Sequence, residues 1–254
     1  MELPAAIPAF FSVVTLASIG STSDEVKRLS RFGAVEGTLV WAAEQTAGHG
    51  RFGRTWISPP GNLYFSLLLR PYLPPGQALQ LTFVAAVALA EAIQGLLPPQ
   101  RRVTCKWPND VLVAGRKISG ILLESSVDAA ALVDSLVVGI GVNVASHPPP
   151  DVVDYAATSL HAEGAGEETA GSMLARFCAA FVDWHAQWRA EGFEPVRQAW
   201  LGRADKLHRP IEVRLEGEIA AGIFTDLDAS GALVLQQGDK CRLIVAGDVL
   251  AARA

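Results

Sequence analysis

Apolar positions along the chain follow two periods, and each period predicts one kind of secondary structure. Short apolar runs bounded by Gly, Pro or Ser predict buried strands, whereas apolar residues recurring every three or four positions predict helices. The predicted strands of the longer, first part of the chain cover residues 11–16, 37–43, 62–70, 111–113, 117–124 and 135–144. The predicted helices lie near residues 26–29 and at residues 78–96, 172–191 and 195–201. The strand at 62–70 is apolar almost throughout, which predicts burial on both faces of a sheet.

The pattern changes at Arg209 to short β segments separated by turns. These segments cover residues 211–215, 219–227, 232–236 and 242–245, with turns at 228–231 and 237–240. Several strands in a stretch of about 45 residues predict a small β-barrel. We therefore expect a main domain of residues 1–206 and a barrel of residues 207–254. No flexible linker separates them, so the two parts are expected to pack together.

The start of the first helix has two possible explanations. Thr22 and Glu25 have the spacing of a capping box, in which the two side chains satisfy free backbone N–H groups. Alternatively, the hydroxyl groups of Ser21 and Thr22 face a ligand. Because capping residues are common at helix starts, the capping box is the favoured prediction.

Composition and charge restrict the possible functions. The chain has 254 residues, of which 50% are hydrophobic, and its formal net charge of -5 disfavours a nucleic-acid-binding surface spread over the whole molecule. Cys105, Cys178 and Cys241 are scattered and the histidines are dispersed, so we expect neither disulfides nor a metal held by side chains alone. The N-terminus lacks the basic segment of a signal peptide. Polar residues interrupt the apolar run at 79–97, which predicts a core helix and no membrane span.

Residues 44–56 combine glycines with two arginines. Glycine allows the backbone to approach a ligand closely, and Arg51 and Arg54 carry the fork of donors that suits phosphate or carboxylate. The stretch therefore predicts an anion-binding loop, with a mobile, solvated surface loop as the alternative.

The glycines of this loop also match the Gly-x-Gly-x-x-Gly motif of dinucleotide-binding proteins. That motif has meaning only where it ends a strand and opens a helix. Pro59 and Pro60 follow too closely for a helix of useful length. A dinucleotide site is therefore rejected for the three glycines Gly48, Gly50 and Gly53.

Two polar residues lie within apolar strands and need partners. Lys117 begins a strand that is otherwise largely apolar, where a cation is costly unless it meets an anion, although a solvated lysine at a hairpin tip is the simpler explanation. By alternation Lys117 shares a face with Ser119, Ile121 and Leu123. Asn143 ends a strand whose two glycines permit close backbone approach. Its partner is either a backbone group or the heteroatoms of a ligand.

Five stretches follow one another in a characteristic order: Ser21-Thr22, Gln45–Trp56, Lys106–Asp110, Arg116–Glu124 and Gly139–Asn143, with the predicted barrel after them. In this order they resemble the biotin protein ligases, the enzymes that attach biotin to carrier domains of biotin-dependent carboxylases. The resemblance covers nearly the whole chain. It implies an α+β fold with a mixed sheet flanked by helices, as in class II synthetases, and an SH3-like C-terminal β-barrel.

The resemblance also implies roles for individual positions. The glycine–arginine loop covers biotin and the adenylate, Lys117 faces the biotin carboxylate, Trp56 packs against the adenylate, and Asn143 contacts adenine. His49 and Phe52 stand where many relatives carry further arginines. The implied catalytic residues are Lys117, Arg51, Arg54, Lys106 and Asp110. The implied binding residues are Ser21, Thr22, Ser23, Gln45, Gly48, Gly50, Arg51, Trp56, Lys117, Gly120 and Asn143.

The chemistry of these residue types suits the implied reaction. A carboxylic acid is ionised at neutral pH, so it needs no general base to attack the α-phosphate of ATP. The lysines and arginines, with Mg²⁺ bound mainly by the phosphates, can screen the repulsion between the two anions. The second step needs a neutral amine, which Asp110 could orient or deprotonate. Asp110 equally fits a residue that caps the turn after Pro108 and Asn109.

Biotin, ATP and Mg²⁺ are thus the expected ligands, and a biotin carboxyl carrier protein or domain is the expected partner. The expected protein is a cytoplasmic monomer or homodimer without nucleic-acid or membrane partners. One alternative is a lipoate or octanoyl protein ligase or transferase of the same fold. A biotin-responsive repressor is disfavoured, because only about ten residues precede the first predicted strand, too few for a helix-turn-helix. A non-catalytic binding module is disfavoured by the presence of Lys117 and Arg51.

Overall fold

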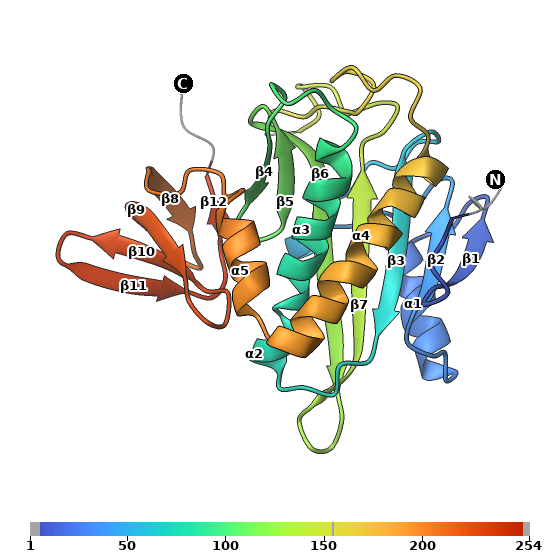
Figure 1. Ribbon diagram of the computed structural model, residues 1–254, viewed down its shortest axis with the longest axis horizontal. Coiled ribbons are helices and arrows are strands. Elements are labelled where there is room, and N and C mark those ends of the chain that lie inside the picture. The colour runs from blue at the N-terminus through green and yellow to red at the C-terminus, as the bar shows by residue number, and fades with distance from the viewer. Residues whose placement is uncertain (1–5, 154, 251–254) are drawn as a thin grey trace.

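A seven-stranded mixed sheet forms the centre of the protein (Figure 1). The computed structural model describes residues 6–153 and 155–250. The strands lie in the order β1-β2-β3-β7-β6-β5-β4, with β1 parallel to β2 and every other pair antiparallel. Their bounds are β1 Ser12–Leu16, β2 Thr38–Ala42, β3 Leu63–Leu69, β4 Val103–Lys106, β5 Asp110–Val113, β6 Arg116–Val127 and β7 Val133–Val142.

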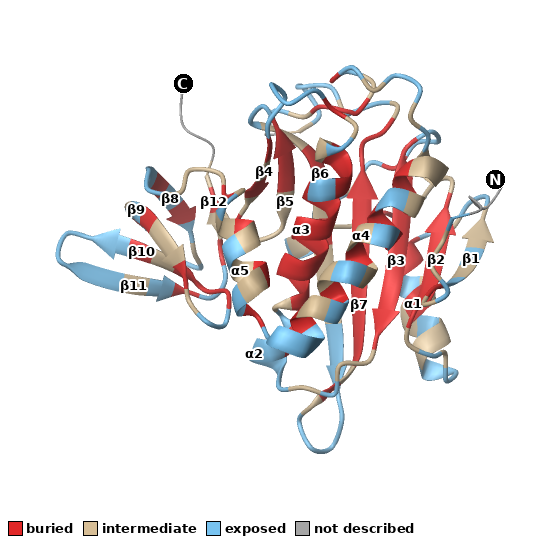
Figure 2. Ribbon diagram, in the orientation of Figure 1, coloured by how far each residue is buried: buried red, intermediate tan, exposed pale blue. Residues whose placement is uncertain are grey.

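Helices cover both faces of this sheet, which buries its central strands on both sides (Figure 2). Two long helices, α3 and α4, lie over one face, and α1 lies behind the sheet against β2, β3 and β7 (Figure 1). All seven residues of β3 are buried, as the unbroken apolar run predicts. The helices are α1 Thr22–Arg31, α2 Pro75–Ala78, α3 Leu81–Gln94, α4 Ala170–Glu191 and α5 Glu194–Leu201.

The sequence explains where α4 begins, ends and packs. Thr169 and Ser172 form a capping box, in which Thr169 Oγ1 accepts from Ser172 N at 3.1 Å and Ser172 Oγ accepts from Thr169 N at 3.0 Å. Gly192, with φ of 78°, ends the helix. Phe177 and Phe181 lie on the apolar stripe predicted from the sequence and are fully buried. The stripe is therefore core packing against the sheet and α3.

The α2–α3 segment is long and apolar enough to cross a membrane, with a mean hydropathy of 1.5 over an 18-residue stretch of residues 75–94. In this fold 72% of that stretch is buried inside the protein. Its apolar residues pack against the sheet and α4, so the segment serves as the core helix that the interrupted apolar run predicts.

The C-terminal part is a separate five-stranded antiparallel sheet in the order β11-β10-β9-β8-β12. It packs on the main domain through a row of aromatic rings. The ring centroids of Phe83 and Trp200 lie 5.5 Å apart, and those of Trp200 and Phe224 lie 6.3 Å apart. A backbone bridge between Cys105 and Ala204 fixes the segment of the main domain that leads into the barrel. The strands are β8 Pro210–Arg214, β9 Ile219–Leu227, β10 Leu233–Gln237, β11 Lys240–Ile244 and β12 Asp248–Val249. The α+β fold with a small C-terminal β-barrel is confirmed.

Several local predictions are wrong or incomplete. The short strands β4 and β12 and the short helix α2 are additional to the expected elements, and the helix expected at 78–96 is α3, Leu81–Gln94. The capping box of Thr22 and Glu25 does not form: Ser21 occupies the N-cap position, and the Glu25 carboxylate binds Arg28. Simple alternation in β6 also fails, because a β-bulge pairs Leu112 with Lys117 but Val111 with Ser119.

Candidate active site

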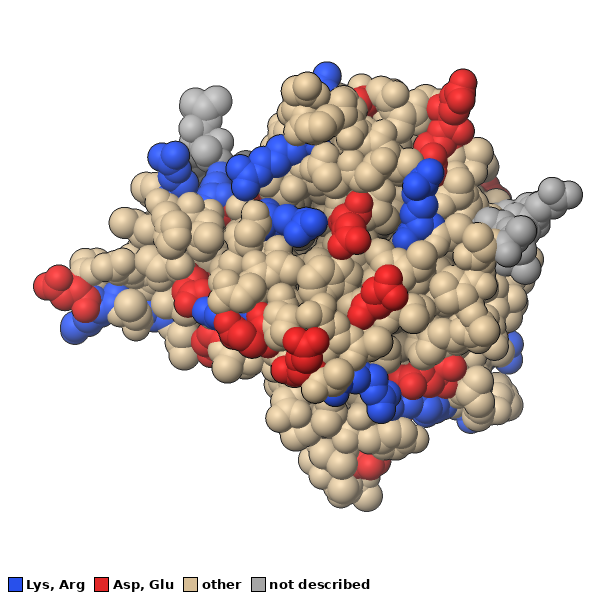
Figure 3. Space-filling model, viewed as in Figure 1, with Lys and Arg blue, Asp and Glu red and all other residues tan. Residues whose placement is uncertain are grey.

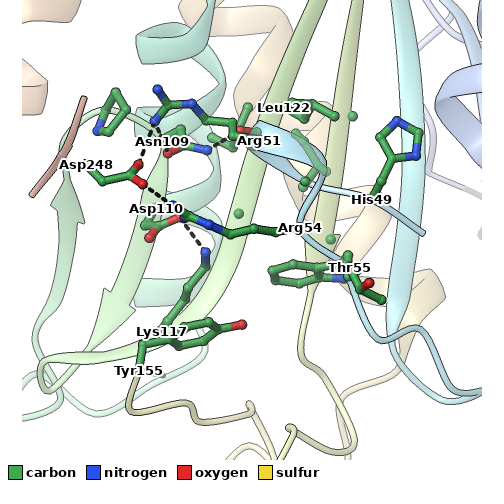
Figure 4. Close-up of a pocket in the computed structure, with 18 of the residues that line it drawn as sticks. His49, Arg51, Arg54, Thr55, Asn109, Asp110, Lys117, Leu122, Tyr155 and Asp248 are labelled. Atoms are coloured by element: carbon green, nitrogen blue, oxygen red, sulfur yellow. Dashed lines mark hydrogen bonds and ion pairs between the residues drawn. The ribbon is translucent and has the colours of Figure 1, made fainter. Parts of the chain in front are cut away.

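A cavity of about 830 Å³ lies between the glycine–arginine loop, the sheet and the barrel (Figure 4). Its walls come from the start of α1, from strands β3, β6 and β7, from the turn between β4 and β5, and from β8 and β12 of the barrel. The bulge in β6 places Lys117, Gly120 and Leu122 on this wall. Segments far apart in sequence therefore meet in one site.

One end of the cavity consists of neutral hydrogen-bonding groups. Thr22 Oγ1 donates to Gln45 Oε1 at 3.0 Å and lies 2.8 Å from Ser66 Oγ. Ser23 Oγ lies 2.9 Å from the same Ser66 oxygen, and Gln45 Nε2 donates to Ser58 Oγ at 3.0 Å. This network orients hydroxyl and amide groups for a polar, uncharged ligand. Ser21 and Thr22 at this helix start line the cavity, whereas the favoured capping box does not form.

The floor of the cavity is made of glycines, because larger side chains would collide with neighbouring groups. A Cβ atom at Gly139 would lie 2.6 Å from Ser23 Oγ, and one at Gly141 would lie 2.3 Å from Trp56 Nε1. A Cβ at Gly120 would lie 3.2 Å from the Trp56 ring. Trp56 therefore lies directly on the sheet, and its indole N–H has no hydrogen-bond partner among the described residues. The close backbone approach predicted for the β7 glycines is confirmed.

Lys117 meets the anion that its position in an apolar strand requires. Its Nζ lies 2.7 Å from Asp110 Oδ1, and the rings of Trp56 and Tyr155 lie 5.4 and 4.9 Å from it (Figure 4). These contacts hold the ammonium group over the cavity. The simpler explanation, a solvated lysine at a hairpin tip, is wrong.

Lys106 brings a second ammonium group to the same wall. Burial lowers its pKa, the Asp110 carboxylate opposes that shift, and the Lys117 charge adds to it. The wall thus concentrates positive charge in a partly desolvated place, where it interacts strongly with an anion.

The glycine–arginine loop extends over the cavity and reaches the barrel. Arg51 Nη1 donates to Asp248 Oδ1 at 3.2 Å, to Gly247 O at 3.2 Å and to Asn109 Oδ1 at 3.4 Å. Arg54 Nη2 donates to the other oxygen of Asp248. Burial lowers the pKa of Arg51, and Asp248 opposes that shift. One barrel carboxylate therefore engages both loop arginines.

The backbone of the loop confirms the rejection of a dinucleotide motif. After Gly50 the chain makes a single 3₁₀ turn, Arg51–Gly53, and then continues as extended backbone. Gly50 N donates to Arg54 O at 2.7 Å, and His49 bridges to Thr55, so the loop folds back on itself. No long helix begins at the third glycine.

Two of the implied binding residues do not line the cavity. Asn143 is buried, and its Nδ2 donates to Thr158 O at 3.0 Å, which is the backbone partner that the sequence left open. At Gly48 a Cβ would approach Ser58 Oγ and Trp56 O to 2.6 Å, so close packing accounts for this glycine. The other implied site residues all line it: Ser21, Thr22, Ser23, Gln45, Gly50, Arg51, Arg54, Trp56, Lys106, Asp110, Lys117 and Gly120.

The cavity also contains residues that the sequence did not identify. Ser66 carries a signal in retrospect, since it is the one polar residue inside the apolar run of β3. The barrel residues carry none, because they belong to short strands with ordinary exposed patterns. The additional residues of most interest are Ser66, Tyr155, Glu212, Arg214 and Asp248.

The arrangement suits one kind of chemistry. A neutral polar end adjoins a wall with two lysines and two arginines, so the cavity can hold a polar ligand and bring a second, phosphate-bearing anion against it. On the face of the molecule seen in Figure 3, positive and negative side chains are scattered, and neither sign covers that face.

Comparisons with known proteins agree with this chemistry. Residues 35–202 match the Biotin/lipoate A/B protein ligase family, and residues 206–250 match the Biotin protein ligase C terminal domain. The chain is 41% identical over 237 residues to the Biotin--[acetyl-CoA-carboxylase] ligase of Paracoccus denitrificans, covering 92% of this chain and 98% of the relative. It is 34% identical over 235 residues to the Bifunctional ligase/repressor BirA of Bacillus subtilis, covering 91% of this chain and 71% of that relative. Its structure is similar to the Biotin protein ligase from Aquifex aeolicus in complex with biotin and ATP, with a TM-score of 0.80 and 27% identity. The similarity covers 96% of this chain and 99% of that chain.

Proposed function

Because this chain belongs to the biotin protein ligase family and is an ATP-dependent biotin ligase, we propose that its cavity forms biotinyl-5′-AMP and passes the biotinyl group to a carrier-domain lysine. The observation that carries the proposal is the junction of a neutral polar end and a cationic wall in one cavity of about 830 Å³. The neutral end offers hydrogen bonds to the polar ring system of biotin. The cationic wall suits its carboxylate and the phosphates of ATP.

In the first step, a biotin carboxylate oxygen forms a bond to the α-phosphorus of ATP, and pyrophosphate leaves with the electron pair of the broken bond. The two reactants are both anions, so the main barrier that the protein can lower is their repulsion. Lys117 is proposed to face the carboxylate, and Lys106, Arg51 and Arg54 the phosphates. Trp56, lying flat on the glycine floor, would pack against the adenylate.

In the second step, a carrier lysine attacks the acyl carbon, AMP leaves, and the attacking amine loses a proton. Asp110 is the proposed group that orients or deprotonates the amine. Its 2.7 Å pairing with Lys117 supports this role, because a biotin carboxylate that engages Lys117 would compete with Asp110 and free it for the incoming amine. Adenylate formation would then prepare the acceptor site.

The loop is proposed to retain the adenylate between the two steps. A mixed anhydride hydrolyses when water reaches it, so a cover that excludes water preserves it. Arg51 and Arg54 place two guanidinium groups on that cover, at the side where the phosphate would lie. Retention also prevents transfer of biotin to unrelated lysines.

Mg²⁺ is proposed to enter with ATP. Three carboxylates line the cavity, those of Asp110, Glu212 and Asp248, and Asp110 and Asp248 each already pair with a cation of the protein. This donor set suits a metal held mainly by the phosphates, where it would neutralise part of their charge. We further propose a cytoplasmic enzyme whose partner is a biotin carboxyl carrier protein or domain.

The proposal is tested by incubating the protein with biotin, ATP, Mg²⁺ and an apo carrier domain and measuring the carrier by mass spectrometry. We expect the mass gain of one biotinyl group, at the carrier's acceptor lysine. Reactions without ATP, and with a carrier whose acceptor lysine is replaced by arginine, serve as controls. Preferential use of lipoate in the same reaction would contradict the assignment.

A further inference from the structure

Phe52 is an exposed aromatic residue at the tip of the glycine–arginine loop. Its side chain is 70% exposed, and its φ of 57° lies in the left-handed region that bulky residues rarely adopt. An exposed ring gains little from burial, and the left-handed region favours Gly or Asn. Neither core packing nor backbone preference therefore accounts for phenylalanine at this position.

Two cations lie beside the Phe52 ring. The guanidinium carbons of Arg51 and Arg54 lie 4.8 and 5.7 Å from the ring centroid, within the range of cation–π attraction. The same two guanidinium groups reach the Asp248 carboxylate. Each arginine is thus held by a ring from its own loop and by a carboxylate from the barrel.

These two partners differ in how they respond to an anionic ligand. A phosphate that enters the cavity competes with Asp248 for the guanidinium groups, because both are anions. The Phe52 ring is neutral and attracts cations through its π face, so it does not compete with the phosphate through charge. When the ligand displaces Asp248, the ring remains the contact that holds the two like charges near each other.

We propose that Phe52 is a positioning residue that keeps Arg51 and Arg54 together over the cavity and thereby lengthens retention of the acyl-adenylate. The inference rests on the proposed function, because the adenylate is the anion concerned. Phe52 acts through the two arginines and touches neither reacting atom.

Three variants separate this role from general loop structure. Phe52→Leu keeps an apolar side chain but removes the π face, whereas Phe52→Trp restores it. Phe32→Leu is the matched control: Phe32 is 80% exposed and has the Arg28 guanidinium carbon 5.6 Å from its ring, but it lies at the end of α1 and does not line the cavity.

The measurement is the half-life of the bound adenylate. Labelled biotin and ATP are incubated with each protein without carrier, excess unlabelled biotin is added, and the protein-bound label is followed with time. For Phe52→Leu we expect release about fivefold to thirtyfold faster than for the parent, the factor for two exposed cation–π contacts. Phe52→Trp and Phe32→Leu are expected to retain the label as the parent does.

Different failures have different meanings. If the parent forms no adenylate, the proposed function fails. If the parent forms it and Phe52→Leu retains it equally long, only the role of Phe52 is refuted. Release from Phe52→Trp as fast as from Phe52→Leu would also refute it, because the π face would then be irrelevant. If Phe52→Leu left the half-life of the adenylate unchanged but raised the KM for the carrier, the role would also be refuted, since the ring would then contact the carrier.

Discussion

Replacing Gly141 by alanine tests whether Trp56 must lie on the sheet for activity. The new Cβ would be 2.3 Å from Trp56 Nε1 and 2.4 Å from Cε2, whereas ordinary contacts begin at 3.4 Å. The indole ring, or β7 itself, must therefore shift by about 1 Å, a displacement that can cost about 100-fold in rate. We expect kcat/KM for biotin-dependent pyrophosphate release to fall by about that factor. The overpacking should also lower the free energy of unfolding by about 1–3 kcal/mol.

The assay is biotin-dependent exchange of labelled pyrophosphate into ATP, with thermal unfolding measured in parallel. Gly76→Ala is the control, because a Cβ there meets nothing within 4 Å. In a Trp56→Leu background, which removes the clash, adding Gly141→Ala should cost far less than it does in the parent. Parental kcat/KM in Gly141→Ala, or equal costs in both backgrounds, would refute the reasoning.

Three further predictions concern Lys117, Arg51 and His185. Lys117→Ala should reduce biotin-dependent pyrophosphate release by about 100-fold to 1,000-fold, because it removes the cation facing the carboxylate; parental rates would contradict its assignment. Arg51→Ala should still form adenylate but release it, seen as biotinylation of bystander lysines on added albumin; retention equal to the parent's would exclude the clamp role. Burial of His185 lowers its pKa, with Glu36 opposing and Arg189 adding to the shift. His185 is therefore protonated more readily in the unfolded chain than in the folded one. As pH drops below about 6.5, the free energy of unfolding should fall, by no more than about 1.4 kcal/mol per pH unit. His185→Gln should reduce this slope in urea titrations, and an unchanged slope would contradict the cause.

Features set by neighbouring residues could be predicted from the sequence. The buried strand β3 follows from its apolar run, and α4 follows from a stripe that includes Phe177 and Phe181. The hairpin of β5 and β6 follows from the turn at Ala114 and Gly115, which both have positive φ. In each case the signal lies within one segment, so its physical cause is readable without tertiary contacts.

Features set by distant partners could not be predicted in this way. Thr22 has the spacing of a cap, yet its hydroxyl group binds Gln45 and Ser66, which are 23 and 44 residues away. The position of Lys117 on the cavity wall depends on a bulge that exists only when β5 pairs with β6. For Lys117 a solvated side chain was the simpler explanation, and only the pairing of β5 with β6 brings Asp110 to it as an anionic partner. In both cases tertiary contacts overturned the alternative that the local pattern favoured.

The barrel shows most clearly why the site could not be assembled from motifs alone. Asp248 and Arg51 are 197 residues apart, and their pairing joins the barrel to the loop over the cavity. Trp107 Nε1 donates to Gly231 O at 3.1 Å, so the barrel also contacts the turn that carries Asp110. Since both the loop over the cavity and one of its walls make direct contacts with the barrel, displacing the barrel would alter the positions of Arg51 and Asp110 together. The strands β8 and β12 therefore form part of the proposed binding site.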